Sequence, residues 1–225
     1  MINILLQGDG ASVDVEDRQK ATALCVAASE GAHSVVKRLL TGGASVNGSP
    51  KEGVVTPLMK ACHRGESTVV HLLIDHGADV NRCHARREFP DVWDPYNFLF
   101  LRGWKPDVGS GQIQSRWTAL AYACGPYVLS RIMEELSSRL LAAGADPNLG
   151  DVVPLETAII YGDQGVTKIL LDAGADPLWV SNECIETLQG VQKRTDGHLY
   201  RKRKEKWSLL QQYYPIMFGS KEYLE

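Results

Sequence analysis

Apolar positions along the chain recur in a two-part pattern with a period of roughly 33 residues. Each copy opens with a short segment in which a leucine and a small alanine lie three residues apart: Thr22–Ala27, Thr56–Ala61, Thr118–Ala123 and Val153–Ala158. A second apolar run follows, as in Val35, Val36, Leu39 and Leu40 or in Val69, Val70, Leu73 and Ile74. Spacings of three and four place apolar side chains on one face of a helix. The pattern therefore predicts pairs of helices that each bury one side.

Start and stop signals bracket these predicted helices. A threonine whose hydroxyl can cap the first helix precedes three of them, at Thr22, Thr56 and Thr118. Val153 has no hydroxyl, so we expect a weaker start in the fourth copy. Pro57 and Pro154 suit the first helical position, where a backbone N–H has no partner in any case. A glycine suited to the left-handed residue after a helix closes each copy, at Gly43, Gly77, Gly144 and Gly174.

This arrangement resembles the ankyrin repeat family, whose unit of about 33 residues carries the signature Thr-Pro-Leu-His-x-Ala. The signature histidine is replaced in the four copies by Cys25, Met59, Ala121 and Glu156. The resemblance covers residues 4–177 apart from one insertion. It implies an all-α solenoid of paired antiparallel helices, with about four and a half repeats and hairpin-like turns along one edge.

The expected organisation is an ankyrin repeat array over residues 1–177 and a helical C-terminal cap over residues 178–225. The array begins with half a repeat, because Ile4-Leu5-Leu6 resembles the end of a second helix. Within the cap, residues 182–192 and 198–214 are expected to form two helices. In the third repeat, Gly125-Pro126 should end the first helix and precede a longer second helix.

An insertion interrupts the array between the second and third repeats, within about residues 82–116. It is rich in aromatic residues, which a flexible linker would lack: Phe89, Trp93, Tyr96, Phe98, Phe100 and Trp104. One interpretation is that these rings anchor the loop on its own repeats. The other is that some of them line a pocket or contact a partner, with Trp93, Tyr96 and Trp104 as the candidate anchors.

Composition and charge narrow the classes of function. The net charge is −3, whereas a general nucleic-acid binder would need a basic surface. The chain has no long apolar stretch and no basic n-region of a signal peptide, so we expect an intracellular protein, cytoplasmic or nuclear, without membrane insertion. The five cysteines form no Cys-x-x-Cys pair, and phosphate-loop, nucleophile and metal motifs are missing. We therefore expect no cofactor, no metal and no catalytic residue.

The resemblance also implies where a partner binds, because partners of ankyrin repeats commonly contact the turn tips and the inner face of the first helices. At the equivalent positions here, Lys60, His63 and Arg64 form a cationic spot that could receive a carboxylate. The other candidate contacts on or beside this face are Trp117, Tyr122, Glu156 and Tyr161.

Several of these candidates have a structural alternative. Arg64 could pair with Glu30, and Lys60 could lie over Tyr122, as surface contacts worth about 0–1 kcal/mol. Glu156 could accept N–H groups at the start of its own helix, or it could act as a general acid or base.

These features predict a non-enzymatic module that binds a protein or peptide partner in its concave groove, with the insertion setting specificity. The alternative is an enzyme or small-molecule binder whose pocket lies between residues 82–116 and the concave face. Cys83-His84 is the adjacent thiol–imidazole pair that such an enzyme could use. A third hypothesis is a nuclear cofactor that uses the basic run Arg201–Lys206, although such a run is more often the solvated face of an end helix.

Overall fold

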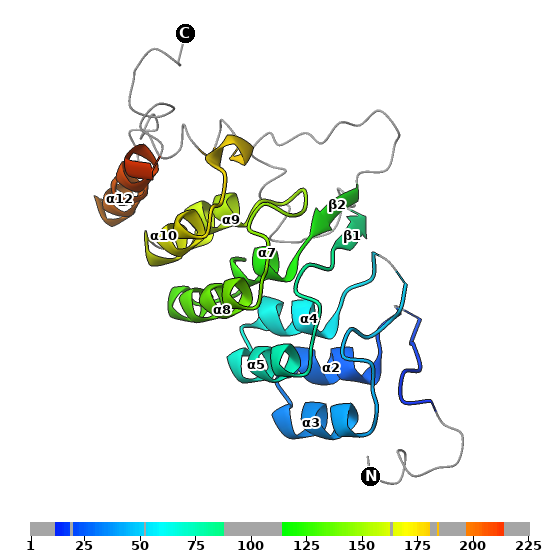
Figure 1. The fold of residues 1–225 in the computed structure, drawn as a ribbon. Coiled ribbons are helices and arrows are strands. Elements are labelled where there is room, and N and C mark those ends of the chain that lie inside the picture. The colour runs from blue at the N-terminus through cyan, green and yellow to red at the C-terminus, as the bar shows by residue number, and fades with distance from the viewer. Residues whose placement is uncertain are drawn as a thin grey trace.

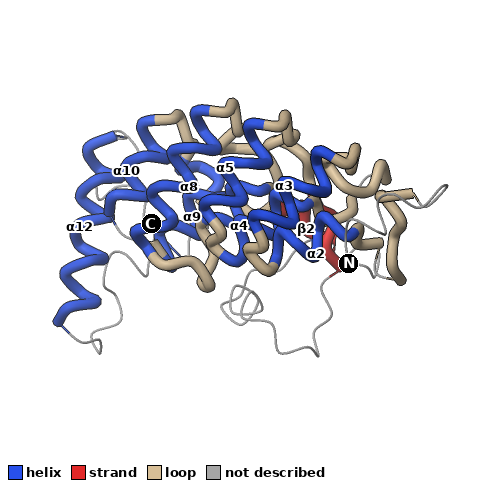
Figure 2. Tube along the Cα trace, turned by 90° about the horizontal axis from the view of Figure 1, so that it is seen from below, coloured by secondary structure: helices blue, strands red, loops and turns tan. Residues whose placement is uncertain are grey.

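The computed structural model describes residues 12–18, 20–51, 53–87, 114–162, 164–180, 184 and 197–213. In this part of the chain, four helix pairs stack side by side in chain order (Figure 1, Figure 2). The pairs are α2 (Ala23–Ser29) with α3 (His33–Thr41), α4 (Pro57–Arg64) with α5 (Ser67–Asp75), α7 (Ala119–Ala123) with α8 (Ser130–Ala142), and α9 (Pro154–Tyr161) with α10 (Gln164–Asp172). A 3-10 turn, η1 (Pro177–Trp179), and the helix α12 (Gly197–Tyr213) follow.

The first helices begin where the threonines predict. The hydroxyls of Thr22, Thr56 and Thr118 each accept a hydrogen bond from the backbone N–H three residues ahead, at 3.4, 3.2 and 3.2 Å. Val153 makes no such bond, which leaves Pro154 as the start signal of α9. Gly43, Gly77, Gly144 and Gly174 have φ angles between 81° and 89°, in the left-handed region. The predicted helix signals are therefore confirmed.

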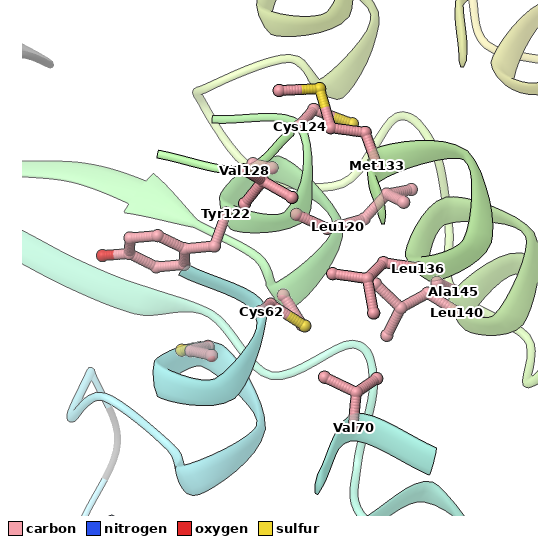
Figure 3. Close-up of a cluster of buried hydrophobic side chains, with 14 of the residues drawn as sticks. Cys62, Val70, Leu120, Tyr122, Cys124, Val128, Met133, Leu136, Leu140 and Ala145 are labelled. Carbon is pink, nitrogen blue, oxygen red and sulfur yellow. The ribbon is translucent and has the colours of Figure 1, made fainter. Parts of the chain in front are cut away.

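The repeats bury one continuous apolar core. Each first helix contributes the leucine expected from the pattern, and all four are at most 1% exposed: Leu24, Leu58, Leu120 and Leu155. Figure 3 shows Leu120 near Leu136 and Leu140 of α8, with Val70 of α5 on the neighbouring repeat. Burial of one such leucine contributes roughly 1.5–3 kcal/mol, so packing between repeats dominates the stability of these short helices.

The third repeat departs from the others in the way that its sequence predicts. α7 ends before Gly125-Pro126, and α8 has 13 residues where α3, α5 and α10 have 9 each. The turn between α7 and α8 leaves Tyr127 and Leu129 exposed, at 47% and 73%. An apolar turn therefore lies at this edge of the third repeat.

A ladder of asparagine side chains links the turn after each repeat to the next turn. The side-chain oxygens of Asn47, Asn81 and Asn148 accept the backbone N–H of Asp79, Asp146 and Asp176, at 2.9, 2.8 and 2.8 Å. Asn81 also donates through Nδ2 to the carbonyl of Gly144 at 2.9 Å. Because Asn81 precedes the insertion and Asp146 follows it, the ladder holds the second and third repeats together across the insertion.

The ends of the insertion form a two-stranded antiparallel ribbon of β1 (His84–Arg87) and β2 (Gln114–Trp117), in which His84 is opposite Trp117. The repeat array is all-α, as expected, and the insertion adds two short strands that the pattern did not predict. Residues 88–113, which include Trp93, Tyr96 and Trp104, lie outside the described residues.

The ribbon is held by the turns on either side of it. In β2, Arg116 donates its backbone N–H and its guanidinium to the carboxylate of Asp151, at 2.9 and 3.0 Å. The backbone N–H of Asp151 donates to the carbonyl of Arg116 at 2.9 Å. Before β1, Arg82 donates to the carbonyl of Lys51 at 3.0 Å. Both ends of the insertion are thus fixed to neighbouring repeats.

The helix α12 packs against α10 at the end of the array opposite α2 and α3 (Figure 1). Its Lys206 is only 4% exposed, and the ammonium donates to the carbonyls of Ile159 and Gly162 at 2.7 and 2.8 Å. The interpretation of the Arg201–Lys206 run as a solvated face is wrong at this residue. Lys206 is buried because its ammonium binds carbonyls at the end of α9 that have no hydrogen-bond partner within the helix. Of the helix expected at 182–192, only Cys184 is described.

Candidate partner-binding face

The cationic spot expected from the sequence lies on α4. Lys60 and His63 are half-buried, and Arg64 is exposed. Because His63 and Arg64 follow Lys60 by three and four positions, the three side chains leave one face of the helix. Val26 holds the position equivalent to Lys60 in the neighbouring helix α2, and Tyr127, in the turn after α7, contacts the ring of His63. We call these five residues the α4 face.

Tyr122 of α7 joins the α4 face to the root of the insertion. Its hydroxyl and Nδ1 of His84 in β1 form a hydrogen bond of 2.8 Å. Its ring centroid lies 5.1 Å from that of Trp117 in β2 and 5.8 Å from that of His63, which it meets edge to face. Figure 3 shows the ring of Tyr122 pointing away from the aliphatic side chains around Leu120 and toward the strands. One tyrosine therefore couples the ribbon to the α4 face.

Trp117 and Tyr122 are expected contact residues that the structure buries, at 1% and 5% exposure. Both rings are therefore less accessible than the sequence interpretation expected, and their role as partner contacts stays a prediction. The ribbon explains why both rings are buried. His84 and Trp117 are opposite each other in the strand register, and both rings pack against Tyr122.

The two surface pairs suggested by the sequence do not form. Within the described ranges, Arg64 makes no ion pair with Glu30, and Lys60 makes no cation–π contact with Tyr122. His63 packs beside the tyrosine ring instead. Among the described side chains, neither Lys60 nor Arg64 has a counter-ion.

Sequence reasoning misses Tyr127 altogether and, for His84, misses its contact with Tyr122. The ring of Tyr127 lies 4.8 Å from that of His63. An aromatic residue directly after Gly125-Pro126 is the signal that could have found it, because such a turn exposes its side chains. His84 stands out in the sequence only through its neighbour Cys83, yet its partner Tyr122 is 38 positions away. No local pattern points to that contact.

Burial disfavours the thiolate forms of the cysteines near this region. Burial, the largest effect, raises the pKa of the Cys83 thiol and so disfavours the reactive thiolate at neutral pH. Burial also raises the pKa of Cys124 to about 12 and that of Cys62 further still. The Cys83–His84 pair therefore gains no support as a catalytic dyad. In the ranges that the structure covers, no three His, Cys, Asp or Glu side chains gather as a metal ion would require.

The two candidates on α9 are half-buried and stand apart from the cationic spot. Glu156 lies in the first turn of α9, where the helix dipole favours a carboxylate, and Tyr161 is the last residue of that helix. α7 lies between α9 and α4 in the stack (Figure 1). The structure therefore brings His63 together with Tyr122 but does not bring Glu156 or Tyr161 next to Lys60.

We expect Tyr122→Phe to lower the free energy of unfolding by about 0.5–1.5 kcal/mol, because it removes the hydrogen bond to His84 and keeps the ring contacts. Urea denaturation of this variant, of His84→Ala and of the double variant measures the coupling. A coupling energy of at least about 0.5 kcal/mol is expected for residues in direct contact. Strictly additive effects would mean that the hydrogen bond does not hold the ribbon.

The comparison with known families identifies the repeat unit. A family model described as ankyrin repeats, in three copies, matches residues 1–83. The resemblance seen in the sequence is therefore confirmed over residues 1–83. The later described pairs, α7 with α8 and α9 with α10, follow the same plan of two helices and a left-handed glycine. Ankyrin repeats generally mediate protein–protein interaction.

Two curated relatives show how far the similarity extends. The ankyrin repeat and KH domain-containing protein mask-1 of Caenorhabditis elegans is 28% identical over 166 residues, which are 70% of this chain and 6% of that protein. The ankyrin repeat and KH domain-containing protein mask of Drosophila melanogaster is 43% identical over 65 residues, which are 29% of this chain and 2% of that protein. The chain thus spans a small fraction of these relatives. None of its described helices combines the length and apolar character needed to cross a membrane.

Proposed function

We propose that this chain is a non-enzymatic ankyrin repeat module that binds a protein or peptide segment on the α4 face, as part of a concave groove. Two features of the α4 face together support the proposal. Lys60 and Arg64 have no described counter-ions, and the ring of Tyr127, which lies beside His63, is 47% exposed. Binding free energy in interfaces is concentrated in a few aromatic and arginine residues, so this combination favours a partner site.

The insertion sets specificity in this proposal. Its described root touches Tyr122, which in turn contacts His63 on the α4 face. Trp93, Tyr96 and Trp104 stay predicted anchors, and Glu156 and Tyr161 stay predicted outer contacts. The alternative of a small-molecule or catalytic pocket depends on residues 88–113, so it also stays a prediction.

A display selection tests the proposal. Short random peptides are selected on the wild-type chain, and the affinity of each recovered peptide is measured for Lys60→Ala/Arg64→Ala. We expect a loss of about tenfold or more, because that is the usual cost of removing charged anchors at an interface.

Lys37→Ala/Arg38→Ala is the matched control, since it removes the same two charges from exposed positions of the second helix α3. It should leave the affinities within about twofold. Peptides that bind all three proteins equally well would contradict binding on the α4 face. Thermal melting of each variant confirms that the repeat array is intact.

A further inference from the structure

Apolar and cationic side chains alternate along the α4 face. Val26 is 55% exposed and follows the capping threonine of α2 by four residues, as Lys60 does in α4. On the other side of the cations, Tyr127 is 47% exposed and packs against His63. Lys60 and Arg64 therefore lie between two exposed apolar side chains that belong to the neighbouring repeats.

The positive charges of Lys60 and Arg64 favour an anionic group on the partner. Lys60 and Arg64 form no ion pair among the described residues, and Glu30, exposed at the end of α2, pairs with neither of them. The chain as a whole carries a net charge of −3, so the cationic spot is a local feature of an acidic protein. A carboxylate forms short, charge-assisted hydrogen bonds with guanidinium and ammonium groups.

We infer that the partner is an acidic peptide segment with a large apolar side chain about three residues away on either side of its carboxylate. Neighbouring helices lie about 8–10 Å apart. A peptide in the polyproline II conformation has three residues per turn and advances about 3.1 Å per residue, so side chains three positions apart lie on the same side and roughly 9 Å apart. This spacing brings the apolar side chains over Val26 and Tyr127. The inference rests on the proposed function and adds the chemistry of the partner.

A peptide fits these observations better than a nucleic acid does. Nucleic-acid binding relies on contacts with many phosphates, which require a long basic surface. Here two cations alternate with apolar side chains over three repeats, which is the arrangement of an interface with a few charged anchors and an apolar surround.

The test uses the peptides recovered by the selection above together with their amide twins, in which each Asp or Glu becomes Asn or Gln. On the wild type, we expect the amide change to cost about tenfold in affinity. On Lys60→Ala/Arg64→Ala, the same change should cost less than about twofold, because the acid then has no cation to meet. Val26→Ala and Tyr127→Ala should each weaken binding by about threefold or more.

Reversing the charges of Lys60 and Arg64 tests whether electrostatic attraction to the peptide carboxylate contributes to binding. Lys60→Glu/Arg64→Glu should reject the acidic peptides and bind versions in which lysine replaces the acid. Recovered peptides that need the α4 face but bind equally well as acids and as amides would overturn this inference and leave the proposed function intact. If no recovered peptide loses affinity on Lys60→Ala/Arg64→Ala, both the inference and the proposed function are wrong.

Discussion

Replacing Lys206 with methionine is expected to lower the free energy of unfolding by about 2–4 kcal/mol. The ammonium of Lys206 is the described donor to the carbonyls of Ile159 and Gly162 at the end of α9. Methionine has a similar length but no N–H, so these buried carbonyls would lose their charged partner. Because the same ammonium also ties α12 to α9, we expect α12 to separate from the array at lower denaturant concentration than the repeats unfold.

Urea denaturation and proteolysis of the native protein measure these two effects. Lys168→Met, on the exposed side of α10, is the matched control and should change stability by less than about 0.5 kcal/mol. If Lys206→Met and Lys168→Met behave alike, the ammonium–carbonyl contacts do not hold α12, and the apolar contacts of Leu209 and Leu210 do so without it.

Gly150→Ala is expected to destabilise the chain by about 3 kcal/mol, for two separate reasons. Gly150 has a φ of +99°, a conformation in which alanine is strained. In addition, a Cβ at this position would lie 2.8 Å from the carbonyl oxygen of Arg116, a backbone atom that cannot move aside alone. β2 would therefore have to shift, which would break the hydrogen bond from the Asp151 N–H and disturb the ribbon beside Tyr122.

Gly144→Ala separates the two reasons. Gly144 has a φ of +89°, but a Cβ there would meet nothing within 4 Å. It should cost about 1–2 kcal/mol from backbone strain alone, so the difference between the two variants reports the contact with β2. Denaturation of both variants in parallel gives this difference. Equal losses would show that the close approach to Arg116 does not constrain the ribbon.

Most of the repeat array could be predicted from the sequence because its signals are local. A threonine cap acts on an N–H three residues ahead, and an apolar face depends on spacings of three and four residues. The predicted caps at Thr22, Thr56 and Thr118 are therefore confirmed, and so is the longer second helix of the third repeat.

The candidate site was predicted less completely because its contacts join distant positions. The sequence placed Lys60, His63 and Arg64 on one helix face, and this follows from local spacing alone. It did not predict that Tyr122 would be buried under a ribbon, because that depends on His84, 38 positions away, and on the register of two short strands.

The sequence by itself determined the helix pairs, their caps and glycine turns, and the surface position of the α4 cations, since each follows from neighbours within one or two helical turns. Only the tertiary structure decided three other features: Lys206 is buried, Trp117 and Tyr122 are buried beside the ribbon, and Lys60 and Arg64 have no described counter-ions. The physical reason is that a charged or aromatic side chain is buried only where packing between separate repeats brings bonding partners close to it. The order of residues along the chain does not give the distance between side chains of separate repeats.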